Sequence, residues 1–181
     1  MTRNFGALLV TLFMASAVSG QGDEQAKRIA EAVLPLPVAL RVDATVMAYE
    51  ADAQRSILRK GTNDWMCFAD EPTPGFSVLC YHTSLDDFLH GNRVLSAQGK
   101  SQEERNPIRQ RELESGALVL PEQALAFTLM GNNRQNALSL TTVWIPFAIA
   151  ESTGLPTEPD SHRPWLMNAG SIGAHIMFPG S

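Results

Sequence analysis

Apolar and polar positions alternate along the first third of the chain in a way that predicts one helix and three strands. In residues 23–33 the apolar positions recur every three or four residues, which predicts an amphipathic helix that ends before Pro35. Residues 44–49 and 56–60 are short and compatible with strands, and the polar stretch between them predicts a hairpin. A third strand is predicted over residues 65–68.

The second half of the chain repeats helices and strands. One helix is expected to begin at Ser84 as its cap, and another at Ser101 or Asn106, ending at Gly116. Strands are expected near residues 125–130, 140–150 and 174–178, with Pro146 confining the second to an edge or a bulge. These elements predict a single small α+β domain with an antiparallel sheet and two or three helices.

The N-terminus has the pattern of an export signal. Arg3 precedes an apolar run over residues 5–18, and small residues follow, with cleavage sites after Ala17 or after Gly20. The alternative, a membrane anchor, needs about 20 apolar residues, more than this run offers. We therefore expect a signal peptide at 1–20, an N-terminal helix and linker at 21–43 and a globular domain at 44–181. The protein is expected to be secreted or periplasmic, with no membrane span after cleavage.

The only two cysteines, Cys67 and Cys80, are expected to form a disulfide in an exported protein. Closing a loop of this length would stabilise the fold by about 3 kcal/mol. A redox or metal-binding pair is the alternative, but the spacing is not C-x-x-C and no recognisable pattern of histidines accompanies it.

Charge and missing motifs exclude several functions. Removal of the signal peptide takes Arg3 away and leaves 13 basic and 19 acidic residues, a net charge of −6. An acidic domain without a basic cluster is not expected to bind nucleic acid or an anionic membrane. The sequence contains no P-loop, dinucleotide glycine fingerprint, H-E-x-x-H or G-x-S-x-G motif, so no cofactor is expected. An enzyme would need a site assembled in space.

Two motifs carry a resemblance. Residues 59–67 read Arg-Lys-Gly-Thr-Asn-Asp-Trp-Met-Cys, and residues 174–177 read Ala-His-Ile-Met. From about Ala44 onward the chain resembles a group of uncharacterised secreted bacterial proteins, with Asp64 standing where the motif has glycine. The resemblance implies export and a shared fold, and it brings no activity with it.

The first of these motifs supplies a candidate ligand site. Arg59, Asn63 and Trp65 flank Gly61, and an arginine, an amide and an aromatic ring together suit a carboxylate or a sugar. The alternative is structural, with Trp65 beside the disulfide and Asn63 forming the turn.

His175 is the candidate acid or base. A strand would turn His175 and Met177 to one face, and Asp160 or Glu151 nearby would favour proton transfer. The alternative is a histidine satisfied in the interior.

A metal site is considered and not predicted. His82, Asp86 and His90 are four residues apart, which on one helix would suit a divalent metal. Ser84 as the helix cap would leave His82 outside the helix and Asp86 in its first turn, which favours a solvated helix face.

Three functions remain open from the sequence. The preferred one is a non-enzymatic domain that binds a small molecule or an envelope protein where Arg59, Asn63 and Trp65 meet His175. The alternative is a small hydrolase-like enzyme that uses His175 as acid or base. The third is a stress or structural protein without a ligand.

Overall fold

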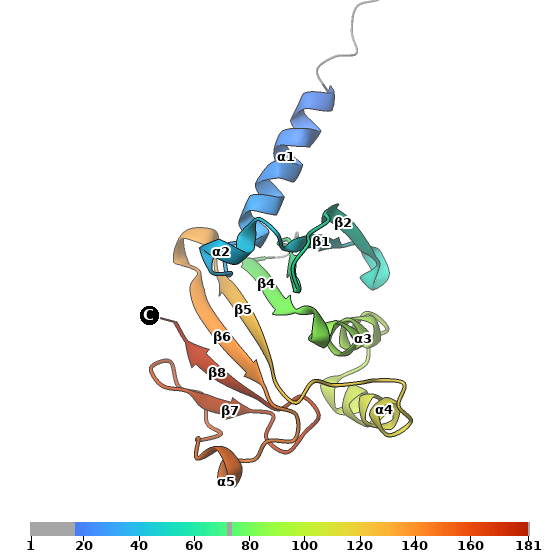
Figure 1. The fold of residues 1–181 in the computed structure, drawn as a ribbon, viewed down its shortest axis with the longest axis vertical. Helices are drawn as coiled ribbons and strands as arrows, with labels where there is room; N and C mark the ends of the chain where they lie inside the picture. The colour runs from blue at the N-terminus through green and yellow to red at the C-terminus, as the bar shows by residue number, and fades with distance from the viewer. Residues whose placement is uncertain (1–16, 72–73, 181) are drawn as a thin grey trace, which may run out of the picture.

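One eight-stranded sheet carries helices on both of its faces (Figure 1). The computed structural model describes residues 17–71 and 74–180. Its helices and strands are, in chain order, α1 (Ala17–Ala32), α2 (Val38–Arg41), β1 (Thr45–Tyr49), β2 (Arg55–Arg59), β3 (Trp65–Phe68), β4 (Phe76–His82), α3 (Asp86–Ala97), α4 (Gln102–Glu114), β5 (Ala124–Gly131), β6 (Leu138–Trp144), α5 (Ala150–Thr153), β7 (Trp165–Met167) and β8 (His175–Pro179). Short 3-10 turns are η1 (Ala51–Ala53), η2 (Thr83–Leu85) and η3 (Arg134–Asn136). The predicted α+β class is confirmed.

The sheet is not purely antiparallel, so that part of the prediction is wrong. The strand order is β2-β1-β3-β4-β5-β6-β8-β7, and β1 and β3 run parallel while every other neighbouring pair is antiparallel. The end of β2 lies beside the start of β1, where Arg59 pairs with Val46. The chain then crosses the start of β1 and enters β3 there, with Met66 opposite Thr45. This short crossing gives β3 the direction of β1.

Within the described residues the helices are also more numerous than predicted, five instead of two or three, because α2 and α5 are single turns of four residues. The first helix, α1, begins at Ala17, within the predicted signal peptide, while residues 1–16 lie outside the described residues. Its exposed part projects away from the sheet in Figure 1, and only its last turn reaches the core at Ile29 and Ala32. None of the helices within the described residues is long and apolar enough to cross a membrane.

Two helix starts were expected, and one is as predicted. Ser101 begins α4 with a capping box, in which its hydroxyl accepts from the Glu104 N–H and the Glu104 carboxylate accepts from the Ser101 N–H. Ser84, in contrast, is not the cap of α3, because η2 precedes that helix. Here the backbone N–H of Ser84 donates to Nδ1 of His82, which takes the capping role.

Strand lengths differ from expectation in two places. Cys80 and the residues before it belong to β4, a buried strand that the turn-rich sequence around Gly75 concealed. Near the C-terminus, β6 ends at Trp144, so Pro146 lies beyond the strand. The short strand β7 is an addition to the predicted set.

The pleat separates the core into two layers. We call the surface that carries Trp65, Cys67 and Cys80 the Trp65 face, and the opposite one, which carries Tyr81 and Trp144, the Tyr81 face. The end of α1 covers part of the Trp65 face, and α3 and α4 cover the Tyr81 face.

The predicted disulfide between Cys67 and Cys80 is confirmed. The two cysteines are direct cross-strand partners on β3 and β4, and their sulfur atoms are 2.05 Å apart. Both residues are fully buried beneath the last turn of α1. The disulfide therefore lies in the core and not on an exposed loop.

Candidate functional site

Arg59 and Asn63 face the backbone and not a cavity. The Arg59 guanidinium donates to the carbonyls of Arg41, at 2.6 Å, and Ala44, at 2.9 Å. The Asn63 amide donates to the Leu40 carbonyl at 2.9 Å, and its oxygen accepts the backbone N–H of Trp65. Both side chains thus hold the segment between α2 and β1, which is the structural alternative considered for them.

Gly61 completes this arrangement, which we call the clasp: residues 59–63 held against residues 40–45. A Cβ atom at Gly61 would overlap the backbone of Asp43 and Thr45. The backbone N–H groups of Thr62 and Asn63 both donate to the Asp43 carbonyl, at 2.7 and 3.1 Å. Residues 59–63 of the first motif therefore let the chain cross the start of β1 at close range.

Trp65 differs from its two neighbours in the motif because it lines a pocket. The half-buried indole contacts the core beside the disulfide and lies 5.3 Å from the Phe127 ring, centroid to centroid. On its open side is a pocket of about 560 Å³, which we call the Trp65 pocket. Its walls are mostly apolar and are formed by Trp65, His82, Ser84, Pro121, Gln123, Ala124, Leu125 and Val143.

The sheet register explains why these residues meet. Trp65 pairs with His82 across β3 and β4, and Leu125 pairs with Val143 across β5 and β6. Residues in register across a sheet lie on the same face, so one transverse row of side chains forms the pocket floor. Leu125 and Val143 could not be recognised as site residues from the sequence, because the pairing of distant strands brings them to Trp65.

His82 contributes its imidazole ring to this pocket. The ring meets Trp65 edge to face, with centroids 5.9 Å apart. Nδ1 lies 2.8 Å from the Ser84 hydroxyl oxygen and 3.3 Å from the Ser84 backbone nitrogen, so both hydrogen-bond contacts of Nδ1 are with Ser84. The pocket therefore combines an aromatic wall with an imidazole ring.

His175 lies in a closed environment on the other face of the sheet. The residue is 7% exposed, and its ring lies 4.4 Å from the Trp144 ring, centroid to centroid, with the two planes tilted by 30°. Nδ1 is 2.7 Å from the Gly173 carbonyl, and no carboxylate among the described residues forms a contact with the ring. Burial lowers the pKa of His175, and the hydrogen bond with Gly173 opposes this in part. This environment is that of a neutral interior histidine.

The structure does not bring His175 together with Trp65. His175 pairs with Trp144, whereas Val143 and Ile176 form the neighbouring row on the opposite side of the sheet. Three strands, β4, β5 and β6, lie between β3 and β8. The expected site where Arg59, Asn63 and Trp65 meet His175 is therefore not formed.

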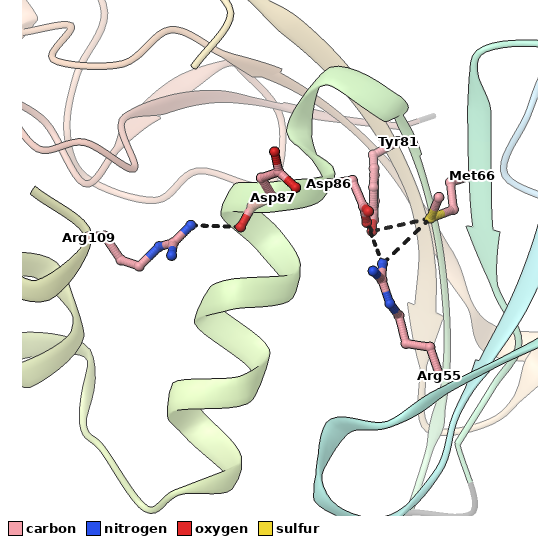
Figure 2. A network of polar contacts seen from close by, with 6 residues as sticks. All are labelled: Arg55, Met66, Tyr81, Asp86, Asp87 and Arg109. Carbon is pink, nitrogen blue, oxygen red and sulfur yellow. Dashed lines mark hydrogen bonds and ion pairs between the residues drawn. The ribbon is translucent and has the colours of Figure 1, made fainter. Parts of the chain in front are cut away.

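A polar network on the Tyr81 face has no counterpart in the sequence analysis (Figure 2). Oδ1 of Asp86 accepts from Arg55 Nη1 at 2.6 Å and from the Tyr81 hydroxyl at 2.8 Å. Burial and the nearby Asp86 raise the pKa of Tyr81, which keeps the phenol protonated as a donor. Burial would lower the pKa of Arg55, but its hydrogen bond and charge interaction with Asp86 raise it. The network joins β2, β4 and α3.

The three residues considered for a metal site each make a different contact. Asp86 belongs to this network, His82 is bonded to Ser84, and the His90 ring stacks with Tyr49 at 6.3 Å. Within residues 17–71 and 74–180, no cluster of three metal-ligating side chains is formed.

Comparison of the chain with protein-family models, with curated proteins and with solved structures gives no match. The resemblance to a group of secreted bacterial proteins therefore stays a prediction, and the assignment of function depends on the geometry of the pockets.

Proposed function

We propose that this protein is a non-enzymatic domain that binds a small molecule in the Trp65 pocket. The ligand carries a flat apolar ring, which contacts the Trp65 indole, and a hydrogen-bond acceptor, which faces the donors at the rim. The observation that carries the proposal is the position of Trp65, which is partly buried in the core and also forms the wall of a pocket of about 560 Å³.

Size and lining support a small molecule. A pocket of about 560 Å³ falls within the range of roughly 300–1,000 Å³ typical of small-molecule sites. Such sites combine mostly apolar walls with a few placed polar groups. Here Leu125, Val143 and Pro121 provide apolar surface, and His82, Ser84 and Gln123 provide the polar groups.

The donor at His82 supports an acceptor on the ligand. With Nδ1 in contact with Ser84, the neutral tautomer that carries its proton on Nε2 offers a donor to a ligand carbonyl, ether or carboxylate oxygen. A second donor at the rim is the amide of Gln123. An apolar ring between Trp65 and Leu125 places the acceptor near these groups.

Export is part of the same proposal. The disulfide in the core supports a protein that folds in an oxidising place, because such bonds are rare in the cytosol. The signal pattern at the N-terminus points the same way. We therefore propose that the pocket binds its ligand in the periplasm or outside the cell.

The test is a screen of monocyclic and bicyclic aromatic fragments, half with and half without an acceptor group, by ligand-observed NMR. Leu125→Trp fills the pocket from a position already 39% exposed, and Leu138→Trp introduces the same side chain at a 70% exposed position outside it. Acceptor-bearing fragments should bind the wild type and Leu138→Trp, and Leu125→Trp should abolish their binding. Equal binding to all three proteins, or no binding to any, contradicts the proposal.

A further inference from the structure

A second pocket lies on the Tyr81 face, between α3, α4 and the loop that joins β7 to β8. Its volume is about 150 Å³. We call it the amide pocket, because four of its residues are carboxamides; it is lined by Phe88, Asn92, Gln102, Arg105, Asn106, Trp144, Asn168 and Gly173. Trp144 follows Val143 on β6 and points to the opposite side of the sheet, so the sheet separates this pocket from the Trp65 pocket.

The walls of the amide pocket are held in place by hydrogen bonds between distant segments. The Gln102 amide donates to the Asn168 oxygen at 3.2 Å, which joins the start of α4 to the β7–β8 loop. Asn168 has a φ of 54°, a left-handed conformation that asparagine tolerates better than most residues. The Ser171 hydroxyl donates to the Asn168 carbonyl at 2.7 Å and accepts from the Gly173 N–H at 3.1 Å. The loop is thus ordered around the pocket.

Arg105 gives this pocket its charge. It is the only ionisable side chain among the lining residues. The guanidinium donates to the Lys100 carbonyl at 3.0 Å, and in the described part of the chain it forms no ion pair with a carboxylate. The nearby Glu104 carboxylate is occupied by the Ser101 N–H. The pKa of Glu103 is lowered mainly by a hydrogen bond with its own backbone and in part by the charge of Arg105, but the two side chains form no ion pair, so the guanidinium keeps N–H groups for an anion.

The remaining polar groups favour an acceptor-rich ligand. The carboxamides of Asn92 and Asn106, one from each helix, offer N–H donors to the pocket as well as carbonyl oxygens. Trp144 contributes its ring to the pocket, while its indole Nε1–H is fully buried and has no acceptor among the described residues.

From these observations we propose that the amide pocket binds a small carboxylate. Arg105 neutralises the carboxylate, and the surrounding amides bind a hydroxyl or carbonyl group on the same molecule. At about 30 Å³ per water molecule, the pocket has room for about five waters, which suits a short-chain hydroxy acid. The site is independent of the Trp65 pocket.

The experiment is a titration of the full mature protein with L-lactate and L-malate in a buffer free of carboxylates. Binding is followed by heteronuclear NMR on the side-chain N–H signals of Trp144, Asn92 and Asn168. L-lactamide is the matched neutral probe. We expect the acids to shift these signals and the amide to bind at least about tenfold more weakly, since a hydrogen-bonded charge is lost.

Three variants test the roles of the pocket residues. Arg105→Gln should weaken binding of the acids by at least about tenfold, whereas Arg111→Gln, an exposed arginine of the same helix, should leave it unchanged. Gly173→Ala places a methyl group in ordinary contact with Phe88 and Trp144, so the protein should fold with a smaller pocket and bind more weakly. The proposal is overturned if neither acid shifts the signals, if L-lactamide binds as well as L-lactate, or if Arg105→Gln binds like the wild type.

Discussion

Arg55 and Asp86 connect the second strand of the sheet to the first turn of α3, with Nη1 of the arginine 2.6 Å from Oδ1 of the aspartate. The same oxygen accepts the hydroxyl of Tyr81, so one carboxylate satisfies two donors on the Tyr81 face (Figure 2). This explains why polar groups are tolerated there: the buried Tyr81 and the half-buried Arg55 share one charged acceptor.

Replacing this carboxylate should destabilise the fold. Asp86→Asn removes the charge opposite Arg55 and weakens both hydrogen bonds, so we expect a loss of about 1.5 to 3 kcal/mol in the free energy of unfolding, measured in urea. Asp87→Asn is the matched control, because Asp87 is exposed in the same helical turn and loses only its interaction with the helix dipole, about 0.3 to 1 kcal/mol. Equal losses in the two variants would contradict a special role for Asp86.

The clasp makes a sharper prediction. Gly61→Ala places a methyl group on the backbone of residues 43–45, so the chain cannot cross β1 at its present distance. We expect a loss of more than about 4 kcal/mol, or failure to fold, which urea denaturation and far-UV circular dichroism would detect. Gly22→Ala, in the exposed part of α1 with open space around it, should be neutral or stabilising. A stable Gly61→Ala protein would refute the close crossing.

His175 should make stability depend on pH. Its pKa is lowered by burial, so the unfolded chain binds a proton at a higher pH than the folded chain does. As the pH falls from about 7.5 to about 5, through the ordinary histidine pKa near 6.5, the free energy of unfolding should therefore decrease. His90, whose pKa is also lowered by burial, contributes in the same direction.

The contribution of His175 can be isolated by substitution. His175→Asn cannot take up this proton, so its urea stability should fall less between about pH 7.5 and about pH 5 than that of the wild type. His162→Asn, at a side chain that is 91% exposed, should keep the wild-type dependence. An unchanged slope in His175→Asn would mean that the folded protein accommodates the charged ring.

Export has its own measurement. When the full chain is expressed in a bacterium, the mature protein should be found outside the cytoplasm and should begin at Val18 or at Gln21, the residues after the two expected cleavage sites. N-terminal sequencing and cell fractionation provide the readout. A protein that keeps Met1 and stays in the cytoplasm would exclude the signal peptide.

Local sequence patterns predicted those features of the fold that residues close together in the chain determine. Ser101, one of the two starts considered for α4, is its cap, and the Glu104 that completes the capping box is only three residues further along the chain. The spacing and number of the cysteines likewise indicated the disulfide. By contrast, β4 was concealed within the segment closed by that disulfide, because the turn residues near Gly75 outweighed the short alternating pattern after them.

Features that depend on distant pairing could not be predicted in this way. Arg59 and Asn63 looked like ligand-binding residues, but their partners are carbonyls of residues 40–44, which only the crossing of β1 brings near. Similarly, the position of Leu125 beside Trp65 depends on the register of β3, β4 and β5. The sequence singled out Trp65, but the other walls of the pocket beside it follow only from this register.

Ligand binding in the Trp65 pocket is tested most simply by following the indole N–H signal of Trp65. The signal is observed by heteronuclear NMR while the acceptor-bearing aromatic fragment that binds most tightly is added. Trp65→Phe assigns the signal, and Trp165, a buried residue outside both described pockets, is the internal reference. We expect the Trp65 signal to shift in a saturable manner while the Trp165 signal stays in place. A fragment that binds without moving the Trp65 signal would contradict the assignment of the site to the Trp65 pocket.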